Sequence, residues 1–333
     1  MSDEAARRFR VSVGEHAGQQ LVVLSDLEAE TQAKLVPGLG FSCVAFRVAL
    51  GDDIWEVLRE PPDADELLHR TMRYGIPILF PWPNRVRGGR FTFGVTEYQL
   101  PTPPEIGNAS HGLARDRPWT VDATGADAGG AFCRASVTLG DLPDDPWPFR
   151  CRLTIEYRLQ GRTLGLHAVA TNTGDVPMPM GFGLHPWFNV PFSPGGSRGS
   201  HELRVPSDKL WELETNLPTG AILPAEAVFD AQDWHALDDT FIDDVYTELQ
   251  HADGWFAAEL REPASGRLVA MRSDATFREH VVYAPLHLPA VCLEPYTCAT
   301  DAFNLAARGL DAGLIVLEPG ASWQGRVAIE ARG

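Results

Sequence analysis

Short segments in which apolar and polar residues alternate recur along the chain, and this alternation limits the possible folds more than any other feature. Residues 152–159 (RLTIEYRL) place Leu153, Ile155, Tyr157 and Leu159 on one side and polar side chains on the other. Because successive side chains of a strand point to opposite faces, this pattern predicts a strand with one buried face.

The same alternation occurs in residues 91–100, where Phe91, Phe93 and Val95 share a face, and in residues 164–170 and 325–331. Residues 256–272 predict a hairpin whose turn is Pro263 to Gly266. Turn residues separate such segments about every ten to fifteen residues, which favours an antiparallel sandwich over a parallel α/β sheet. We therefore predict an all-β fold, a large antiparallel β-sandwich.

Only two helices are predicted, both short. Residues 63–72 begin with two acidic residues, and residues 301–308 begin at an acidic cap and end before Gly309. Residues 191–200 (PFSPGGSRGS) predict a surface loop, because strand patterns resume on both sides. With no linker between two distinct halves, we expect one domain over residues 1–333.

The charge of the chain excludes some classes of partner. Lysine and arginine total 28 against 45 acidic residues, a formal net charge of −17, which repels nucleic acid and anionic membranes. No secretory signal and no apolar run of about 18 residues is present. We expect a soluble, cytoplasmic monomer or homodimer whose partner is a small molecule.

Several cofactor signatures are missing. The five cysteines are scattered without a Cys-x-x-Cys pair, which predicts reduced thiols. No phosphate-binding loop, dinucleotide fingerprint or His-Glu-x-x-His sequence occurs. We expect neither a cofactor nor a metal.

Polar residues inside apolar or proline-rich segments are the candidates for chemistry. In Phe80-Pro81-Trp82-Pro83-Asn84-Arg85, the amide and guanidinium are suited to sugar hydroxyls, and Trp82 offers a flat face to a sugar ring. A turn with an exposed arginine is the alternative.

Two histidines stand in such segments. His111 precedes Gly112 in a loop, where a structural hydrogen bond is the simpler interpretation. His185 lies among apolar and aromatic residues before Pro186, where an imidazole can act as a general acid or be a satisfied buried group.

Two acidic segments complete the set. Glu294 interrupts the apolar run Val291 to Tyr296, and a carboxylate buried there needs a cation or a functional reason. Asp238 and Asp239, before Thr240-Phe241, form a weaker candidate, because acidic pairs are common in solvated turns.

In this order, the five segments resemble the aldose 1-epimerase (mutarotase) family, which has the galactose mutarotase-like β-sandwich fold. The resemblance spans roughly residues 75–305 and rests on Pro83-Asn84-Arg85, His111-Gly112, His185-Pro186-Trp187-Phe188, Asp238-Asp239-Thr240-Phe241 and Glu294-Pro295-Tyr296 with the residues that follow, to Ala302.

The resemblance implies an isomerase that interconverts the α and β anomers of a hexose. It implies Glu294 as the general base on the anomeric hydroxyl and His185 as the general acid on the ring oxygen. Arg85 and His111, with Asn84 close by, would hold the sugar, and so would Asp238 or, one residue on, Asp239.

Two alternatives stay open at this point. One is a hexose-6-phosphate 1-epimerase, with Arg87 and Arg90 as phosphate contacts. The other is a non-catalytic carbohydrate-binding module on the same fold, against which the presence of both an acid and a base argues.

Overall fold

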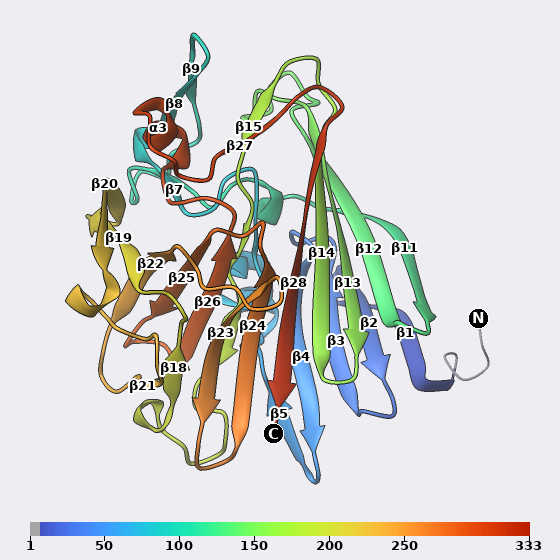
Figure 1. Ribbon diagram of the computed structural model, residues 1–333. Coiled ribbons are helices and arrows are strands. Elements are labelled where there is room, and N and C mark those ends of the chain that lie inside the picture. The colour runs from blue at the N-terminus through green and yellow to red at the C-terminus, as the bar shows by residue number, and fades with distance from the viewer. Residues whose placement is uncertain (1–6) are drawn as a thin grey trace.

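The computed structural model describes residues 7–333, and most of its regular structure is antiparallel β-sheet (Figure 1). One layer is a nine-stranded sheet. Its strands, in spatial order, are β11 (Thr120–Asp127), β12 (Gly130–Leu139), β13 (Cys151–Gln160), β14 (Thr163–Asn172), β28 (Ser322–Arg332), β24 (Arg267–Asp274), β23 (Trp255–Glu262), β18 (Glu202–Arg204) and β21 (His235–Ala236).

Two further sheets pack against this layer. The first is a five-stranded meander of β1 (Phe9–His16), β2 (Gln19–Asp26), β3 (Thr31–Val36), β4 (Ser42–Leu50) and β5 (Asp53–Glu56). The second runs in the order β20 (Leu217–Pro224), β19 (Lys209–Glu214), β22 (Ile242–Thr247), β25 (Glu279–Ala284), β26 (Ala290–Tyr296), β16 (Gly183–Leu184) and β6 (Ile78–Leu79), with β17 (Trp187–Asn189) also paired to β26. We call this second sheet the site sheet.

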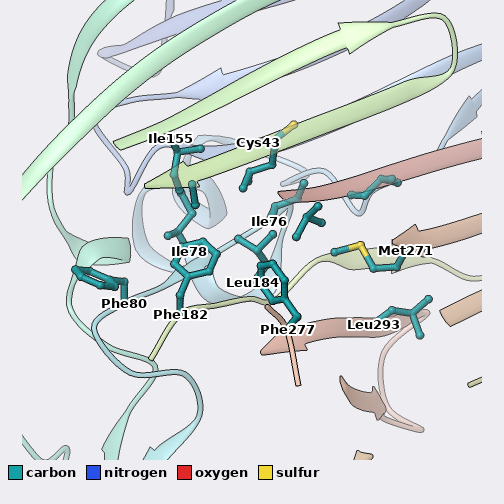
Figure 2. Close-up of a cluster of buried hydrophobic side chains, with 14 of the residues drawn as sticks. Cys43, Ile76, Ile78, Phe80, Ile155, Phe182, Leu184, Met271, Phe277 and Leu293 are labelled. Carbon is teal, nitrogen blue, oxygen red and sulfur yellow. The ribbon is translucent and has the colours of Figure 1, made fainter. Parts of the chain in front are cut away.

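Two isolated bridges connect the region of the five-stranded sheet to the region of the site sheet. Cys43 of β4 pairs with Ile76, and Leu58 pairs with Phe188 of β17. The three sheets enclose a common hydrophobic core, in which Cys43, Ile155, Met271 and Leu293 come from four different strands (Figure 2). The predicted antiparallel sandwich is confirmed.

Strand β26 shows how the core and the outer face of the site sheet are divided. Leu293 belongs to the main core, whereas the next residue, Glu294, points to the opposite face. All seven residues of β26 are buried, so both faces of the strand are covered. A strand buried on both faces reads as a nearly continuous apolar run, which is why one carboxylate stands out in it.

The smaller strand pairs and helices lie around this sheet. The pairs are β7 (Arg85–Val86) with β10 (Ala109–Ser110), β8 (Arg90–Phe93) with β9 (Thr96–Gln99), and β15 (Met178–Met180) with β27 (Ile315–Leu317). The α-helices are α2 (Ala64–His69) and α3 (Ala302–Ala307), and single 3-10 turns occur at Thr71–Arg73, Arg87–Gly89, Ala114–Asp116, Arg198–Ser200 and Ala225–Ala227. Within residues 7–333, no helix is both long enough and apolar enough to cross a bilayer.

Most predicted elements are present, with two differences. Residues 91–100 do not form one strand: they form the β8–β9 hairpin, and Val95 at its turn is fully exposed instead of sharing a buried face with Phe91. Asp301 precedes α3, but its side chain does not cap that helix and accepts instead from the backbone N–H of Arg87 at 2.9 Å. The predicted hairpin in residues 256–272 is confirmed as β23 and β24, and the helix in residues 63–72 as α2 and the turn after it.

Candidate active site

Strand register brings His185 beside Glu294. Gly183 pairs with Tyr296, and Trp187 pairs with Cys292. His185 lies midway between Gly183 and Trp187, so it falls opposite Glu294, which lies midway between their partners on β26. Its Nε2 lies 3.3 Å from Glu294 Oε1. Both side chains are almost wholly buried, and the imidazole stacks on the ring of Trp187 at 5.1 Å.

The second oxygen of Glu294 has its own partner. The hydroxyl of Tyr296, two residues along the same strand, donates a hydrogen bond to Oε2. Residues i and i+2 of a strand share a face, so this contact follows directly from the strand geometry. It leaves Oε1 facing His185.

Burial governs the ionisation of the pair. It raises the pKa of Glu294 well above its usual value, an effect that the Tyr296 hydrogen bond opposes. Burial also lowers the pKa of His185 to about 3, assisted by the positive charges of Arg115 and Arg85. Both shifts have the same physical origin, since a low-dielectric interior disfavours whichever form carries charge.

The next two candidates lie in loops close to this pair, and both have a left-handed backbone conformation. Asn84 (φ 52°) and His111 (φ 58°) adopt that conformation, and the backbone N–H of His111 donates to the carbonyl of Asn84 at 2.6 Å. Gly112 follows with φ 68°, and a Cβ there would lie 2.3 Å from the carbonyl oxygen of Phe80. Only glycine allows this close approach, which explains the histidine-glycine sequence.

The side chains of this loop face the acid–base pair. The rings of His111 and His185 meet edge to face at 5.3 Å, and Arg85 Nη1 donates to Asn84 Oδ1 at 3.0 Å. Burial, with the charges of His185, Arg115 and Arg85, lowers the pKa of His111 well below its usual value.

A cavity of about 530 Å³ joins these residues, and we call it the site cavity. Five of the seven predicted site residues line it: Asn84, Arg85, His111, His185 and Glu294. Its other lining residues are Met72, Arg73, Ile106, Ser110, Arg115, Asn216, Phe241, Asp243, Val281, Tyr283 and Tyr296.

The two aspartates expected to hold the sugar do not reach the site cavity. Asp238 and Asp239 are exposed and do not line the site cavity, and the carbonyl of Asp238 accepts from Arg198 Nε at 2.9 Å. Asp243, on β22, lines it instead. Burial raises the pKa of Asp243, and the charge of Arg85 opposes that shift.

Trp82 also departs from expectation. Its ring is 3% exposed and lies 5.8 Å from the ring of Trp147 in the main core, and it does not line the site cavity. The ring that was expected to face a sugar is therefore buried in the core. Trp82, between Pro81 and Pro83, packs into the core, whereas Asn84 and Arg85, which follow this segment, line the site cavity.

One group within the described chain has ligand atoms close enough to hold a metal ion. Atoms of His185, Cys292 and Glu294 lie within 4.8 Å of one another. Burial raises the pKa of the Cys292 thiol well above its usual value, so a metal would have to displace a tightly held proton. The closeness of these three side chains does not by itself require a bound metal.

A family model described as aldose 1-epimerase matches residues 36–330. The chain belongs to the aldose 1-epimerase family. Among curated relatives, the uncharacterized protein YihR of Escherichia coli is 26% identical over 248 residues, 73% of this chain and 74% of that protein. Galactose mutarotase of Mus musculus is 29% identical over 203 residues, 56% of this chain and 55% of the mouse protein.

Solved structures of galactose mutarotase-like proteins have the same fold as this aldose 1-epimerase family member. One from Clostridium acetobutylicum superposes with a TM-score of 0.87 at 20% identity, covering 98% of this chain and 99% of the other. Galactose 1-epimerase from Lactobacillus acidophilus gives a TM-score of 0.76 at 17% identity, covering 97% and 98%.

Two residues of this aldose 1-epimerase family site were missed by sequence reasoning. Asp243 lies in the strand Ile242–Thr247, partly buried and beside a second acidic residue, Asp244. This adjacent pair does not stand out in the sequence as the single carboxylate of Glu294 does. Tyr296 was part of the recognised segment, and its place two residues after Glu294 was the only indication of their contact.

Proposed function

We propose that this protein is an aldose 1-epimerase that interconverts the α and β anomers of an uncharged hexose, with Glu294 as general base and His185 as general acid. The observation that carries this proposal is the contact of Glu294 with His185 at 3.3 Å on the wall of a cavity lined with hydrogen-bonding groups. Family membership supports the same class of reaction.

The reaction needs two proton transfers, one at each of the two oxygens bound to the anomeric carbon. Removing the proton of the anomeric hydroxyl while protonating the ring oxygen opens the ring to the aldehyde. Rotation about C1–C2 presents the other carbonyl face, and the reverse transfers close the ring. General acid and base groups in position contribute about 10²–10⁴-fold each.

The resting pair holds the right number of protons for this reaction. Burial favours a protonated Glu294 and a neutral His185. The reactive form, a carboxylate and an imidazolium, contains the same single proton moved across the 3.3 Å contact. Hydrogen bonds from Tyr296 and from a bound sugar favour the charged form, so substrate binding can bring about this transfer without a proton from solvent.

The surrounding polar groups are suited to orienting the sugar. We assign hydroxyl contacts to Asn84, Arg85, His111 and Asp243, the last in place of Asp238. Nδ1 of His111 is buried and has no hydrogen-bond partner in the described part of the protein, as expected of a group that awaits a ligand. Donors at Arg85 and His111 would also stabilise oxygens that gain negative charge as the ring opens.

The residues suggested for a phosphorylated substrate lie elsewhere. Arg87 forms an ion pair with Asp301 at 3.5 Å, and Arg90 donates to Gln99 at 3.0 Å. Neither lines the site cavity. A purely binding module would have no need for an acid and a base in contact, so the geometry favours catalysis.

Five free, buried cysteines are stable in a reducing compartment, and we propose the cytoplasm as the place of action.

The direct test of function is the exchange rate between anomers, measured by NMR exchange or by polarimetry with freshly dissolved α-glucose and α-galactose. We expect acceleration over buffer with at least one aldose. No acceleration with any aldose would refute the proposal.

A further inference from the structure

Asp301 is a buried carboxylate that the proposed reaction does not use. It is 3% exposed and does not line the site cavity, although it lies on the segment that leads from Glu294 and β26 into α3. An aspartate in the N-cap position usually accepts from the first turn of its helix, and Asp301 does not. Because a charge in the interior needs partners, the groups that bind this carboxylate indicate its role.

Three contacts of Asp301 reach the segment that carries Arg85. The backbone N–H of Asp301 donates to the carbonyl of Arg85 at 2.8 Å, and its Oδ1 accepts from the backbone N–H of Arg87 at 2.9 Å. Its Oδ2 forms an ion pair with Nε of Arg87 at 3.5 Å. One residue therefore holds the chain on both sides of Val86, which is itself fully buried.

Asn304, in α3, completes this attachment. Its Nδ2 donates to Asp301 Oδ1 at 2.6 Å and to the carbonyl of Arg90 at 3.0 Å. Helix α3 lies against β7 and β8, the two strands of this segment (Figure 1). We call Asp301 and Asn304 the clamp, because together they fasten residues 85–90 to the chain that follows β26.

The backbone of Asp301 explains why an aspartate suits this position. Its conformation is left-handed, with φ 58° and ψ 28°. Aspartate and asparagine tolerate this conformation better than most residues, and glycine adopts it freely. Asparagine therefore supplies both the conformation and an acceptor oxygen, whereas glycine supplies the conformation alone. The two roles of Asp301 can be separated by substitution.

Arg85 depends on such an attachment because its own strand is very short. Strand β7 consists of Arg85 and Val86, which pair with the two residues of β10 in a two-stranded sheet. Asn84, just before it, has a left-handed backbone. Arg85 lines the site cavity from this point. Displacing a group that orients a substrate by about 1 Å can lower the rate by about 10²-fold.

We infer that Asp301 is a positioning residue, which fixes the backbone of Arg85 so that the guanidinium meets the sugar in one orientation. The inference rests on the proposed function, in which Arg85 contacts the sugar. It adds to the site a residue that itself touches no substrate. It also links Arg85 to Glu294, because both clamp residues belong to the segment that follows β26.

Two substitutions separate the acceptor from the backbone conformation. Asp301→Asn keeps an acceptor oxygen for the N–H of Arg87, so we expect kcat/KM for anomer exchange to stay within about threefold of the unaltered protein. Asp301→Gly keeps the left-handed backbone and removes the acceptor, so we expect kcat/KM to fall by about tenfold or more.

A matched control makes the same change elsewhere. Asp253 is an exposed aspartate with a left-handed backbone (φ 51°), and it does not line the site cavity. Asp253→Gly should therefore leave kcat/KM unchanged. The unfolding midpoint of every variant is measured alongside its rate, so that a loss of fold is recognised.

A double-mutant cycle tests whether Asp301 acts through Arg85. In the Arg85→Ala background the side chain to be positioned is gone, so we expect Asp301→Gly to lower kcat/KM there by less than about twofold. A merely structural role would lower the rate by the same factor in both backgrounds. Exchange is followed by NMR, with the enzyme concentration adjusted to give a measurable rate for each variant.

Asn304→Ala takes the place of Asp301→Gly in this cycle if the glycine variant does not fold. It removes the Nδ2 donor to Asp301 Oδ1 and leaves the carboxylate in place. We expect kcat/KM to fall by about threefold or more, and this fall should again disappear in the Arg85→Ala background.

The outcomes separate the inference from the function on which it rests. An unchanged kcat/KM in the clamp variant, an equal fall in both backgrounds, or an Asp301→Asn variant as slow as Asp301→Gly would refute the positioning role and leave the epimerase intact. If the unaltered protein anomerises no sugar, the proposed function itself is refuted, and the inference falls with it.

Discussion

Nε2 of His185 lies 3.3 Å from Oε1 of Glu294, although the two residues are about a third of the chain apart. The pairing of β16 and β17 with β26 fixes this contact through backbone hydrogen bonds on both sides of His185. The sheet thus holds the pair in register before any sugar binds. Such preorganisation lowers the cost of reaching a reactive geometry.

Replacing the base is expected to remove activity but leave the fold intact. Glu294→Gln keeps the shape of the side chain and cannot accept the anomeric proton, so we expect the exchange rate to fall by about 10²–10⁴-fold. Polarimetry gives the rate, and circular dichroism with the unfolding midpoint is the control. Undiminished turnover in a folded variant would show that another residue is the base.

The pH profile follows from the directions of the two pKa shifts. In the proposed mechanism the pair is active with one proton. A second proton would add to His185, whose pKa is lowered to about 3, and the last would leave Glu294, whose pKa is raised. We therefore expect kcat/KM to stay level as the pH falls from 7 to 5, and to decline on the alkaline side as the pair loses its proton. An acid limb near pH 6.5, the usual histidine value, would contradict the assignment.

Tyr296 is expected to act as a positioning residue for Glu294. Its hydrogen bond lowers the pKa of that carboxyl, so Tyr296→Phe should raise it and move the alkaline limb to higher pH. Losing a hydrogen bond to a charged group costs about 1.5–3 kcal/mol, so we expect kcat to fall about 10- to 100-fold with little change in KM. A lower kcat with an unshifted pH profile would indicate a merely structural role.

Asp243 and Asp238 form a matched pair that tests the sugar contacts. Asp243→Asn removes a carboxylate from the site cavity and should raise KM for the sugar by about tenfold or more. Asp238→Asn changes an exposed residue outside the cavity and should match the unaltered protein. The reverse order of effects in saturation curves would restore Asp238 as the sugar ligand.

Chelation tests whether the His185, Cys292 and Glu294 cluster needs a metal. Both proton transfers can be carried out by the side chains, so dialysis against a chelator should leave the exchange rate unchanged. Rates before and after dialysis are compared with the metal content of the sample. A loss of activity that added Zn²⁺ restores would overturn the cofactor-free mechanism.

The fold was predictable because the signal for it is local. Alternation in residues 152–159 reports one buried face, and β13 shows it residue by residue. The segment at 91–100 misled because Gly94 and Val95 form a turn without breaking the alternation of apolar residues. Two short strands and one longer strand are indistinguishable in such a pattern.

The two residues of the proposed acid–base pair were predictable because each is a polar residue that interrupts an apolar segment. Glu294 and His185 stand out in this way, and their contact then follows from strand register. Asp243 was missed because its place at the cavity depends on β22 pairing with β25 and β25 with β26, a long-range register that the sequence does not reveal. Trp82 was misjudged because an aromatic beside polar residues gives no sign of which way it packs.

The two faces of β26 have a consequence for how the protein can change over evolutionary time. Leu293 contributes to the core that all three sheets share, while its neighbour Glu294 faces the cavity. A shift of this strand that accommodates a different core residue would also move the carboxylate. The exposed hairpin tip at Asn216, between β19 and β20, lies outside that core. We therefore expect preferences among sugars to change there while the proposed acid and base stay fixed.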